Sequence, residues 1–424
     1  MERNESFFHK IIEGVHDMCY IWKKEMAMFI RDEGVLIFCV IVPLAYPLLY
    51  SWCYNNEKVE EVPVAVVDLS HSAQSREFIR KYDASPEVKV AYHCNNLKEG
   101  EALVGHQAVR GVLYFPPDFA TRLNRLEQSM VSVYCDMSLM LNYKAIYATA
   151  TSVSLDMNKT IQVKLNHHYT AHEEEVASQP LGYTEVPIFN PVGGYGHFII
   201  PAVLILIIQQ TLLLGIGMSA GTARETNRYR DLVPVSRHYN GIFRIVLGKS
   251  LCYFMVYLVM SAYLTMVVPR MFSFISFPEH QALLGLMIPY ILACIFFGMT
   301  LSCIIRYREN VILLIVFTSI PLLFLTGVSW PESAIPGFLR SIAYLFPSTF
   351  GVRGFVRINT MGASLADIQH EYQMLWIQVV VYFFATCLVY RSQILHARRH
   401  ALERMERIKE KTRQARQAKE GAIQ

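Results

Sequence analysis

The sequence predicts a polytopic α-helical membrane protein with six transmembrane helices, a re-entrant hairpin and an extracytoplasmic α/β domain between helices 1 and 2. Of its 424 residues 53% are hydrophobic and only 17% are charged, whereas soluble domains carry about 25% charged residues. The deficit comes from long apolar runs, each near the ~20 residues that cross a hydrocarbon core. Six such runs are present, at 34–54, 197–220, 242–268, 282–305, 310–330 and 371–391.

The first 33 residues precede the first run, and we expect them to stay on the chain. They contain "KKEMAMFIRDE", which has acidic residues and lacks the apolar core of a signal peptide. These residues lead into the first span at 34–54. That span is then an uncleaved anchor.

The distribution of basic residues predicts that both termini are cytoplasmic. Arginine and lysine gather in 1–33, in 222–249 and in 391–419, while the loop 269–281 has only Arg270. Cytoplasmic segments carry the excess of basic residues in membrane proteins. An even number of spans returns the chain to the side on which it started, so six spans agree with this orientation.

Residues 55–196 differ from the apolar runs and are typical of a small α/β domain. Four short β-branched segments bounded by turn residues predict strands; they are "VPVAVVDLS", "VKVAYHC", "GVLYFP" and "VSVYCD". The segments between them space their apolar residues as helices do. This alternation favours an α/β arrangement, followed by a long polar helix at about 138–178.

The cysteines and histidines of this domain predict no metal site. The sequence does not decide whether Cys94 and Cys135 form a disulfide, because it does not supply the distance and geometry that a disulfide requires. His168 and His172 stand four residues apart, and imidazoles at that spacing can share a metal ion. No third ligand is specified, so we interpret the pair as part of a solvated helix face.

Gly248-Lys249-Ser250 ends like a Walker A phosphate loop, but we predict no nucleotide site and no catalytic residue on this chain. The motif needs a glycine five positions before Gly248, where Phe243 stands. The segment also runs directly into an apolar span, without the flexible loop that turns backbone amides toward phosphate. We expect Lys249 to lie near the cytoplasmic end of the third span and to extend toward the lipid headgroups.

Residues 331–348 follow the fifth run and are predicted to form a re-entrant segment. Pro331, Pro336 and Pro347 interrupt them, and proline breaks a helix in its interior. A broken helix at membrane depth needs protein or a water-filled cavity around it. A short hairpin that enters the membrane from the outer side satisfies that requirement.

Two further features each allow two interpretations. Gln209 and Gln210 lie midway along the second span, where polar side chains either bridge helices or line a translocation path. Residues 392–424 form a basic tail that either lies on anionic lipid or is a solvated helix. The apolar residues of the tail fall on a rough helical stripe: Leu395, Leu402, Met405 and Ile408.

Four stretches, in this order, resemble the membrane subunit of type 2 ABC exporters. They are "WKKEMAMFIRDEGVLIFCVIVPLAYPLLY"; "VPVAVVDLSHSAQSREFIRKYDASPEVKV" with "RGVLYFPPDFATRL"; "NPVGGYGHFIIPAVLILIIQQTLLLGIGMSAGTARE" with "LVPVSRHYNGIFRIVLGKSLCYFMVYLV"; and "IPLLFLTGVSWPESAIPGFLRSIAYLFPSTFGVRGF". The first stretch looks like the family's amphipathic entry helix, which the resemblance places in the cytoplasm within 1–33, at about 9–31. The pair of segments from 55–196 resembles the large extracytoplasmic domain of the multidrug-exporter-like branch. The last stretch is similar to the family's C-terminal signature, with Pro321, Gly327, Pro331, Pro336, Pro347 and Arg353. The resemblance covers the chain up to about residue 391.

This resemblance implies the permease subunit of an ATP-driven exporter in the bacterial inner membrane. Its cargo would be a hydrophobic or amphiphilic molecule such as a drug, a lipid or a lipid-linked glycan. ATP and Mg²⁺ would bind a separate cytosolic ABC ATPase that pushes on the N-terminal helix and on the loop 222–240. The charged residues of these segments either dock that ATPase or only solvate the surface; they are Glu25, Arg31, Arg224, Glu225 and Asp231.

The resemblance also implies a second permease copy or a related permease, membrane lipid around the spans, and a periplasmic adaptor with an outer-membrane channel as further partners. Nucleic acid is not expected, because the basic tail follows a membrane span and has a membrane explanation. Two other classes of function remain as alternatives. One is a signalling protein that uses an ATPase to move its outer domain without transport, and the other is a membrane-embedded enzyme, which needs ionisable groups that the spans hardly contain.

Overall fold

Two compact units make up the chain in the computed structural model. The helical unit consists of Met1–Asn55 and Gly194–Gln424, and the α/β unit is Asn56–Gly193. The structure describes residues 7–54, 59–125, 127–165, 170, 173, 186, 188–190, 194–226, 241–274, 279–302 and 307–421.

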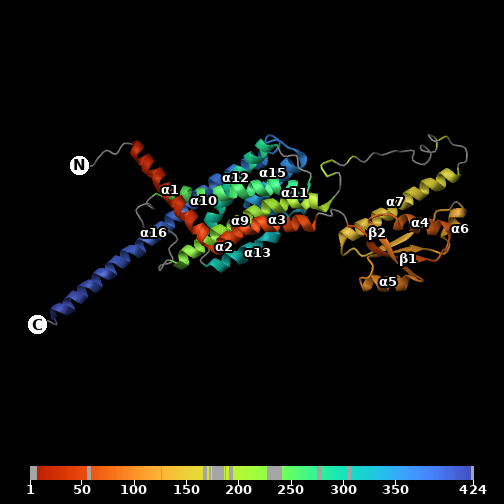
Figure 1. Ribbon diagram of the computed structural model, residues 1–424, viewed down its shortest axis with the longest axis horizontal. Helices are drawn as coiled ribbons and strands as arrows, with labels where there is room; N and C mark the ends of the chain where they lie inside the picture. The colour runs from red at the N-terminus through yellow and green to blue at the C-terminus, as the bar shows by residue number, and fades with distance from the viewer. Residues whose placement is uncertain are drawn as a thin grey trace. The chain divides into compact units, whose positions relative to one another are not determined.

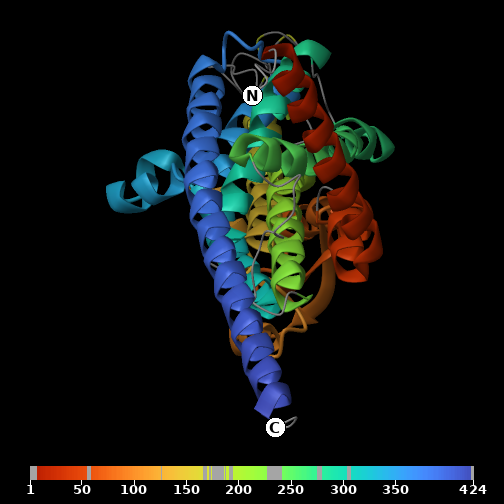
Figure 2. The ribbon, with the colours of Figure 1, turned by 90° about the vertical axis from the view of Figure 1, so that its left-hand side faces the viewer.

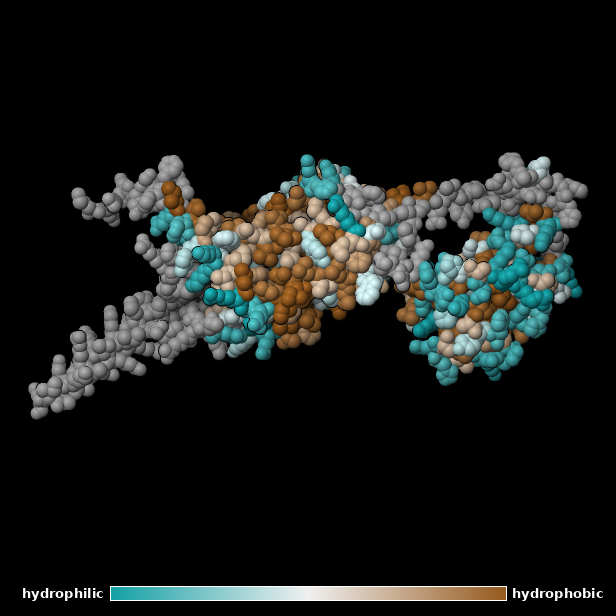
Figure 3. Space-filling view, in the orientation of Figure 1, coloured by the Kyte–Doolittle hydropathy of each residue, from teal (hydrophilic) through white to brown (hydrophobic). Residues whose placement is uncertain are grey.

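Long apolar helices dominate the helical unit. Its elements, in chain order, are α1 (Phe7–Arg31), α2 (Glu33–Leu36), the π-helix η1 (Ile37–Ile41), α3 (Val42–Cys53), α9 (Tyr195–Thr226), α10 (Ile242–Ala262), the π-helix η3 (Tyr263–Val267), α11 (Val268–Met271), α12 (His280–Ser302), α13 (Arg308–Leu325), the 3-10 helix η4 (Glu332–Ala334), α14 (Gly337–Ala343), α15 (Pro347–Met361) and α16 (Gln369–Gly421). Hydrophobic side chains cover the middle of its visible face, and hydrophilic ones gather at the end that holds α1 (Figures 1 and 3).

Six helices are long and apolar enough to cross a membrane, which confirms the six predicted runs. They are Glu33–Cys53, Tyr195–Glu225, Ile242–Met271, His280–Ser302, Arg308–Leu325 and Gln369–Leu395. The first of them, called the first span below, joins α2, η1 and α3 without a break.

The six spans differ in how far the rest of the chain covers them. The most apolar stretch of α9 is 89% buried, because the other helices surround it, whereas that of α13 is only 11% buried. A helix that is apolar on every face is typically enclosed by others, and α9 runs through the centre of the unit (Figure 1). The outer face of α13 is free to meet lipid or another chain.

The segment after α13 forms three short helices and no continuous span. Pro331 and Pro336 stand directly before η4 and α14, and Pro347 is the first residue of α15. Proline is favoured at a helix start because the first backbone N–H groups of a helix have no acceptor within the helix, so the N–H that proline lacks is not needed there. The predicted interruption of 331–348 is therefore present, although α15 continues to Met361. Entry of this segment into the membrane from the outer side stays a prediction.

Close packing holds α15 against the centre of the unit. A Cβ atom on Gly351 would lie 2.4 Å from the ring of Tyr290 on α12, so only glycine allows this approach. The last span and the basic tail then form a single helix, α16, of 53 residues. It runs as one rod along the helical unit and beyond it (Figures 1 and 2).

The α/β unit is built on a four-stranded sheet with strand order β2-β1-β3-β4. Its elements are β1 (Val62–Asp68), α4 (Ala73–Asp83), β2 (Val88–Cys94), α5 (Leu97–Gly105), β3 (Gly111–Phe115), α6 (Phe119–Asn124), β4 (Ser132–Cys135) and α7 (Met140–Leu165). Strand β1 is parallel to β2 and β3, and β4 is antiparallel to β3. The four predicted strands and the helices between them are confirmed.

Helices cover both faces of this sheet. Val64 and Val66 of β1 pack with Phe78 and Tyr82 of α4 on one face, where α7 also lies. The intervening β1 side chains pack with α5 on the other face. Because β1 is covered on both sides, its residues from Val62 to Val67 are all apolar, without the alternation of a half-exposed strand.

The disulfide that the sequence left open is excluded. Cys94 ends β2 and Cys135 ends β4, and these are the two edge strands of the sheet. Three steps between neighbouring strands separate them by ~14 Å, whereas bridged cysteines have Cα atoms within ~7 Å. Both are free thiols. His168 and His172 lie outside the described residues, and the described residues hold no group of three or more ligands suited to a metal ion.

Candidate functional site

Two charge pairs hold the amphipathic helix α1 against α10. Lys249 Nζ lies 2.9 and 2.8 Å from the two carboxylate oxygens of Glu25, and the Tyr253 hydroxyl donates to Glu25 Oε1 at 3.4 Å. Nearer the N-terminal ends of both helices, Arg244 Nη1 lies 2.6 Å from Asp17 Oδ2. We call these two pairs the clamp.

The Glu25–Lys249 pair is buried, with Glu25 2% and Lys249 7% exposed. The expectation that Lys249 extends to the lipid headgroups is therefore wrong. The glycine of the Gly-Lys-Ser motif has a packing role, because a Cβ atom on Gly248 would lie 2.9 Å from the Met18 carbonyl oxygen. The glycine lets the backbone of α1 approach α10, and the lysine then reaches the glutamate.

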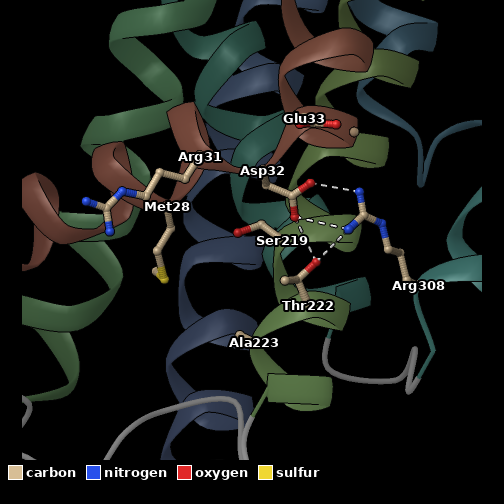
Figure 4. A pocket seen from close by; sticks show the side chains of 9 residues that line it. Met28, Arg31, Asp32, Glu33, Ser219, Thr222, Ala223 and Arg308 are labelled. Carbon is tan, nitrogen blue, oxygen red and sulfur yellow. Dashed lines mark hydrogen bonds and ion pairs between the residues drawn. The ribbon is translucent and has the colours of Figure 1, made fainter.

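A second cluster joins three helix ends, and we call it the three-way node. It consists of Asp32, which directly precedes the first span, Thr222 near the end of α9, and Arg308, the first residue of α13. Arg308 Nη2 lies 2.7 Å from Asp32 Oδ1, and Thr222 donates to Asp32 Oδ2 at 2.8 Å. Arg308 Nη1 donates to the Thr222 hydroxyl at 3.0 Å. Figure 4 shows the three side chains pointing toward one another.

Within the node, the negative charge of Asp32 is compensated by Arg308 and by hydrogen bonds. Partial burial raises the pKa of Asp32, but hydrogen bonds from Thr222, Arg308 and the Val35 amide outweigh it and hold that pKa below its usual value. Asp32 therefore stays ionised, and it also caps α2 by accepting from the Val35 amide at 3.2 Å. Gly34 leaves space for the guanidinium, since a Cβ atom there would lie 2.0 Å from Arg308 Nη2.

A cavity of about 580 Å³ lies beside the node. Met28, Arg31, Glu33 and Ser219 line it together with the node residues. Arg31 points away from Asp32 and from the other node residues (Figure 4). The cavity therefore presents charged groups of both signs from α1 and the first span, next to the end of α9.

Gln209 bonds within the helical unit and bridges helices. Its Oε1 accepts from the Ser348 amide at 2.7 Å, and its Nε2 donates to the Ser348 hydroxyl at 3.1 Å. The Cys294 thiol also contacts Oε1, at 3.8 Å. The side chain is fully buried. Of the two interpretations of Gln209, the structure favours the helix bridge, which ties α9 to the start of α15.

Gln210 points in another direction, toward a groove of about 420 Å³. The groove is lined by the first span, α9 and α13, with Phe38, Tyr46 and Ile315 among its apolar and aromatic residues. None of the described residues that line it is charged. Gln210 Nε2 and Oε1 are buried and have no hydrogen-bond partner in the described part of the chain.

The node and the groove involve the same three helices. Asp32, Thr222 and Arg308 fix the ends of the first span, α9 and α13, and these three also form the groove walls. The clamp attaches α1, which directly precedes Asp32, to a fourth span, α10. The three walls of the groove are thus tied together at the node, and α1 leads directly into one of them.

The comparison with known proteins agrees with this arrangement. The family model described as ABC-2 family transporter protein matches residues 34–388. The chain belongs to the ABC-2 transporter family. It is thus the membrane subunit of an ABC transporter, a subunit that is not itself catalytic and works with an ABC ATPase subunit. The linearmycin resistance permease protein LnrN of Bacillus subtilis (strain 168) is 21% identical over 361 residues, which cover 77% of this chain and 88% of that protein.

The structure describes four of the five charged residues predicted at the ATPase interface, and they lie in different surroundings. Glu25 is buried in the clamp, and Arg224 is buried at the end of α9. Arg31 and Glu225 are exposed, and Glu225 Oε1 accepts from the Arg308 amide at 3.4 Å. Asp231 lies outside the described residues. In this ABC-2 permease, Arg31 and Glu225 are thus the described members of the set that a partner can reach.

Sequence reasoning did not single out Asp32, Thr222 or Arg308. A signal for two of them was present, because an aspartate and an arginine stand directly at the starts of two apolar runs. Opposite charges at the same end of two spans can pair across the bundle. Nothing in the sequence indicated that Thr222 would join them.

Proposed function

We propose that this permease is the translocating subunit of an ATP-driven exporter. It moves a hydrophobic or amphiphilic molecule, such as a drug, a lipid or a lipid-linked glycan, outward across the bacterial inner membrane. Both termini are cytoplasmic and the α/β unit is outside. One observation carries the proposal: the three helices joined at the three-way node are the three that line the groove.

The partner ATPase binds ATP and Mg²⁺ and acts on α1, with Arg31, Glu225 and the segment 222–240 as its contact. The clamp supports this role for α1. The buried ion pair keeps α1 attached to α10, because loss of one partner leaves an uncompensated buried charge at a cost of about 3–5 kcal/mol. Movement of the ATPase is thereby delivered to α10 through the clamp and to the groove walls through the node.

A second permease copy, or a related permease, covers α13. The exposed side of that helix carries large apolar side chains, and Phe317 and Ile320 are 74% and 66% exposed. Such a face fits either lipid or a partner helix. In this proposal the groove opens toward the second permease, and a periplasmic adaptor with an outer-membrane channel completes the export route.

The test is ATP-driven movement of a probe in sealed vesicles. The permease and its ATPase are reconstituted together, and uptake of the amphiphilic dye Hoechst 33342 and of a fluorescent phospholipid is followed. We expect ATP-dependent movement of a probe away from the ATPase side, and none with a non-hydrolysable ATP analogue. Vigorous ATP hydrolysis without movement of either probe would contradict export and favour the signalling alternative.

A further inference from the structure

Gln210 has unmet hydrogen-bonding capacity. Its donor and its acceptor are both buried, and neither has a partner in the described residues. Its neighbours on the groove wall are satisfied: Thr211 donates to the Ile207 carbonyl at 2.7 Å and Ser319 to the Val316 carbonyl at 2.9 Å. A buried amide without partners is costly, so its retention in an apolar groove needs an explanation.

The groove itself limits what can supply the missing partner. Its volume of about 420 Å³ lies in the range of ~300–1,000 Å³ that is usual for small-molecule sites. A lipid acyl chain fills the space but offers neither a donor nor an acceptor. A charged group finds no counter-charge among the described lining residues, and burial of an unpaired charge is strongly unfavourable.

We propose that Gln210 selects cargo that carries an uncharged group with both a hydrogen-bond donor and an acceptor, such as an amide or a hydroxyl, on an apolar body. This inference rests on the proposed function, since it takes the groove as the cargo's path. The apolar body packs against Phe38, Leu206 and Ile315. The uncharged polar group meets the Gln210 amide after a rotamer change, because the residue is partly exposed while its amide atoms are buried in the present conformation.

The first span supplies a second, independent observation. Its π-helix η1 (Ile37–Ile41) carries Phe38 into the groove wall. Single π-helical turns inside an α-helix are frequent at functional sites. The turn also brings Cys39 onto α9, where its thiol lies 3.7 Å from the Thr211 carbonyl oxygen. The part of the groove wall that holds Phe38 is thus shaped locally, and this supports a ligand site in the groove.

The experiment measures binding to the purified permease in nanodiscs, without ATPase or ATP. The probes share one pyrene-labelled decyl chain and differ only at its end: a primary amide, a plain hydrocarbon and a trimethylammonium group. Wild type is expected to bind the amide about tenfold or more tightly than the hydrocarbon, because a site built for a hydrogen bond rejects an analogue without it. Gln210→Leu is expected to abolish that preference and to leave hydrocarbon binding unchanged.

Two further variants keep the result interpretable. Ser319→Ala lines the same groove but loses a hydroxyl that already bonds to its own helix, so the amide preference is expected to persist. Gln210→Glu is expected to shift the preference toward the trimethylammonium probe. Thermal unfolding reports on folding, and Gln210→Leu is expected to unfold at the same or a higher temperature, because it removes an unpartnered polar group.

Specific outcomes overturn the inference. They are equal affinity of wild type for the amide and the hydrocarbon, an amide preference that survives Gln210→Leu, and a change from dimer to monomer in that variant, which would make a second permease the partner of Gln210. Since no ATP is used, amide selection without transport in vesicles would refute the proposed function alone. Transport of a probe without a Gln210 effect would refute this inference alone.

Discussion

Glu25 on α1 and Lys249 on α10 are 224 residues apart in the chain and form a bidentate ion pair, with Nζ 2.9 and 2.8 Å from the two carboxylate oxygens. Both side chains are almost fully buried. This pair fixes the amphipathic helix to a membrane span. Lys249, whose sequence context resembles the end of a phosphate loop, therefore has a structural role.

The first prediction concerns this pair. Glu25→Gln should lower the free energy of unfolding by about 3–5 kcal/mol, because it leaves Lys249 buried and unpaired. The double variant Glu25→Leu, Lys249→Met should recover most of that loss, since no charge is left buried. Chemical unfolding of the detergent-solubilised permease measures both. A single variant as stable as wild type would show that the pair does not hold α1.

The second prediction concerns Gln209. Gln209→Leu should lower the free energy of unfolding by about 1–3 kcal/mol, because the buried Ser348 amide and hydroxyl lose their partners. The neighbouring change Gln210→Leu removes an amide that has no such partners and serves as the matched control. Thermal unfolding of the two variants side by side checks the difference. If both changes destabilised equally, the distinction between the two glutamines would be lost.

The third prediction concerns orientation. Glu101 is exposed on α5, so Glu101→Cys should react with a membrane-impermeant thiol reagent in intact cells if the α/β unit is outside. The background carries serine at the cysteines of this region, Cys53, Cys94 and Cys135. A cysteine at Arg31 is the matched control and should react only after lysis. The reverse pattern would place the α/β unit in the cytoplasm.

The sequence sufficed for every feature that depends on local pattern. Six apolar runs gave six membrane-length helices, and four β-branched segments gave four strands, because hydrophobic burial and strand propensity act within each segment. The sequence did not reveal which residues pair with each other across the helix bundle. Lys249 was expected at the headgroups because its acidic partner stands 224 residues earlier, and the bonds of Arg308 to Asp32 and Thr222 span 276 and 86 residues.

The two glutamines show the same limit at the scale of one residue. Successive side chains on an α-helix point about 100° apart, so Gln209 and Gln210 had to face different surroundings. The pattern of α9 did not reveal which was which, because that helix is apolar on every side. Only the positions of α15 and α13 decide that Gln209 bridges helices and Gln210 faces the groove.

The fourth prediction addresses the central claim, that the three-way node delivers the motion of the ATPase to the groove walls. Asp32→Asn removes the charge that holds Arg308, and Thr222→Val removes one hydrogen bond of the same node. Glu33→Gln is the matched control, because Glu33 is exposed and lines the same cavity without joining the node.

The decisive measurement is ATP hydrolysis by the co-purified ATPase in vesicles, with and without the amphiphilic dye, together with dye movement. For Asp32→Asn we predict normal ATPase binding and a loss of dye-stimulated hydrolysis and movement within the usual range for coupled sites, about 5- to 150-fold. Thr222→Val should lose less, and Glu33→Gln should match wild type. Asp32→Asn with full stimulation and full dye movement, in a normally folded permease, would contradict the account.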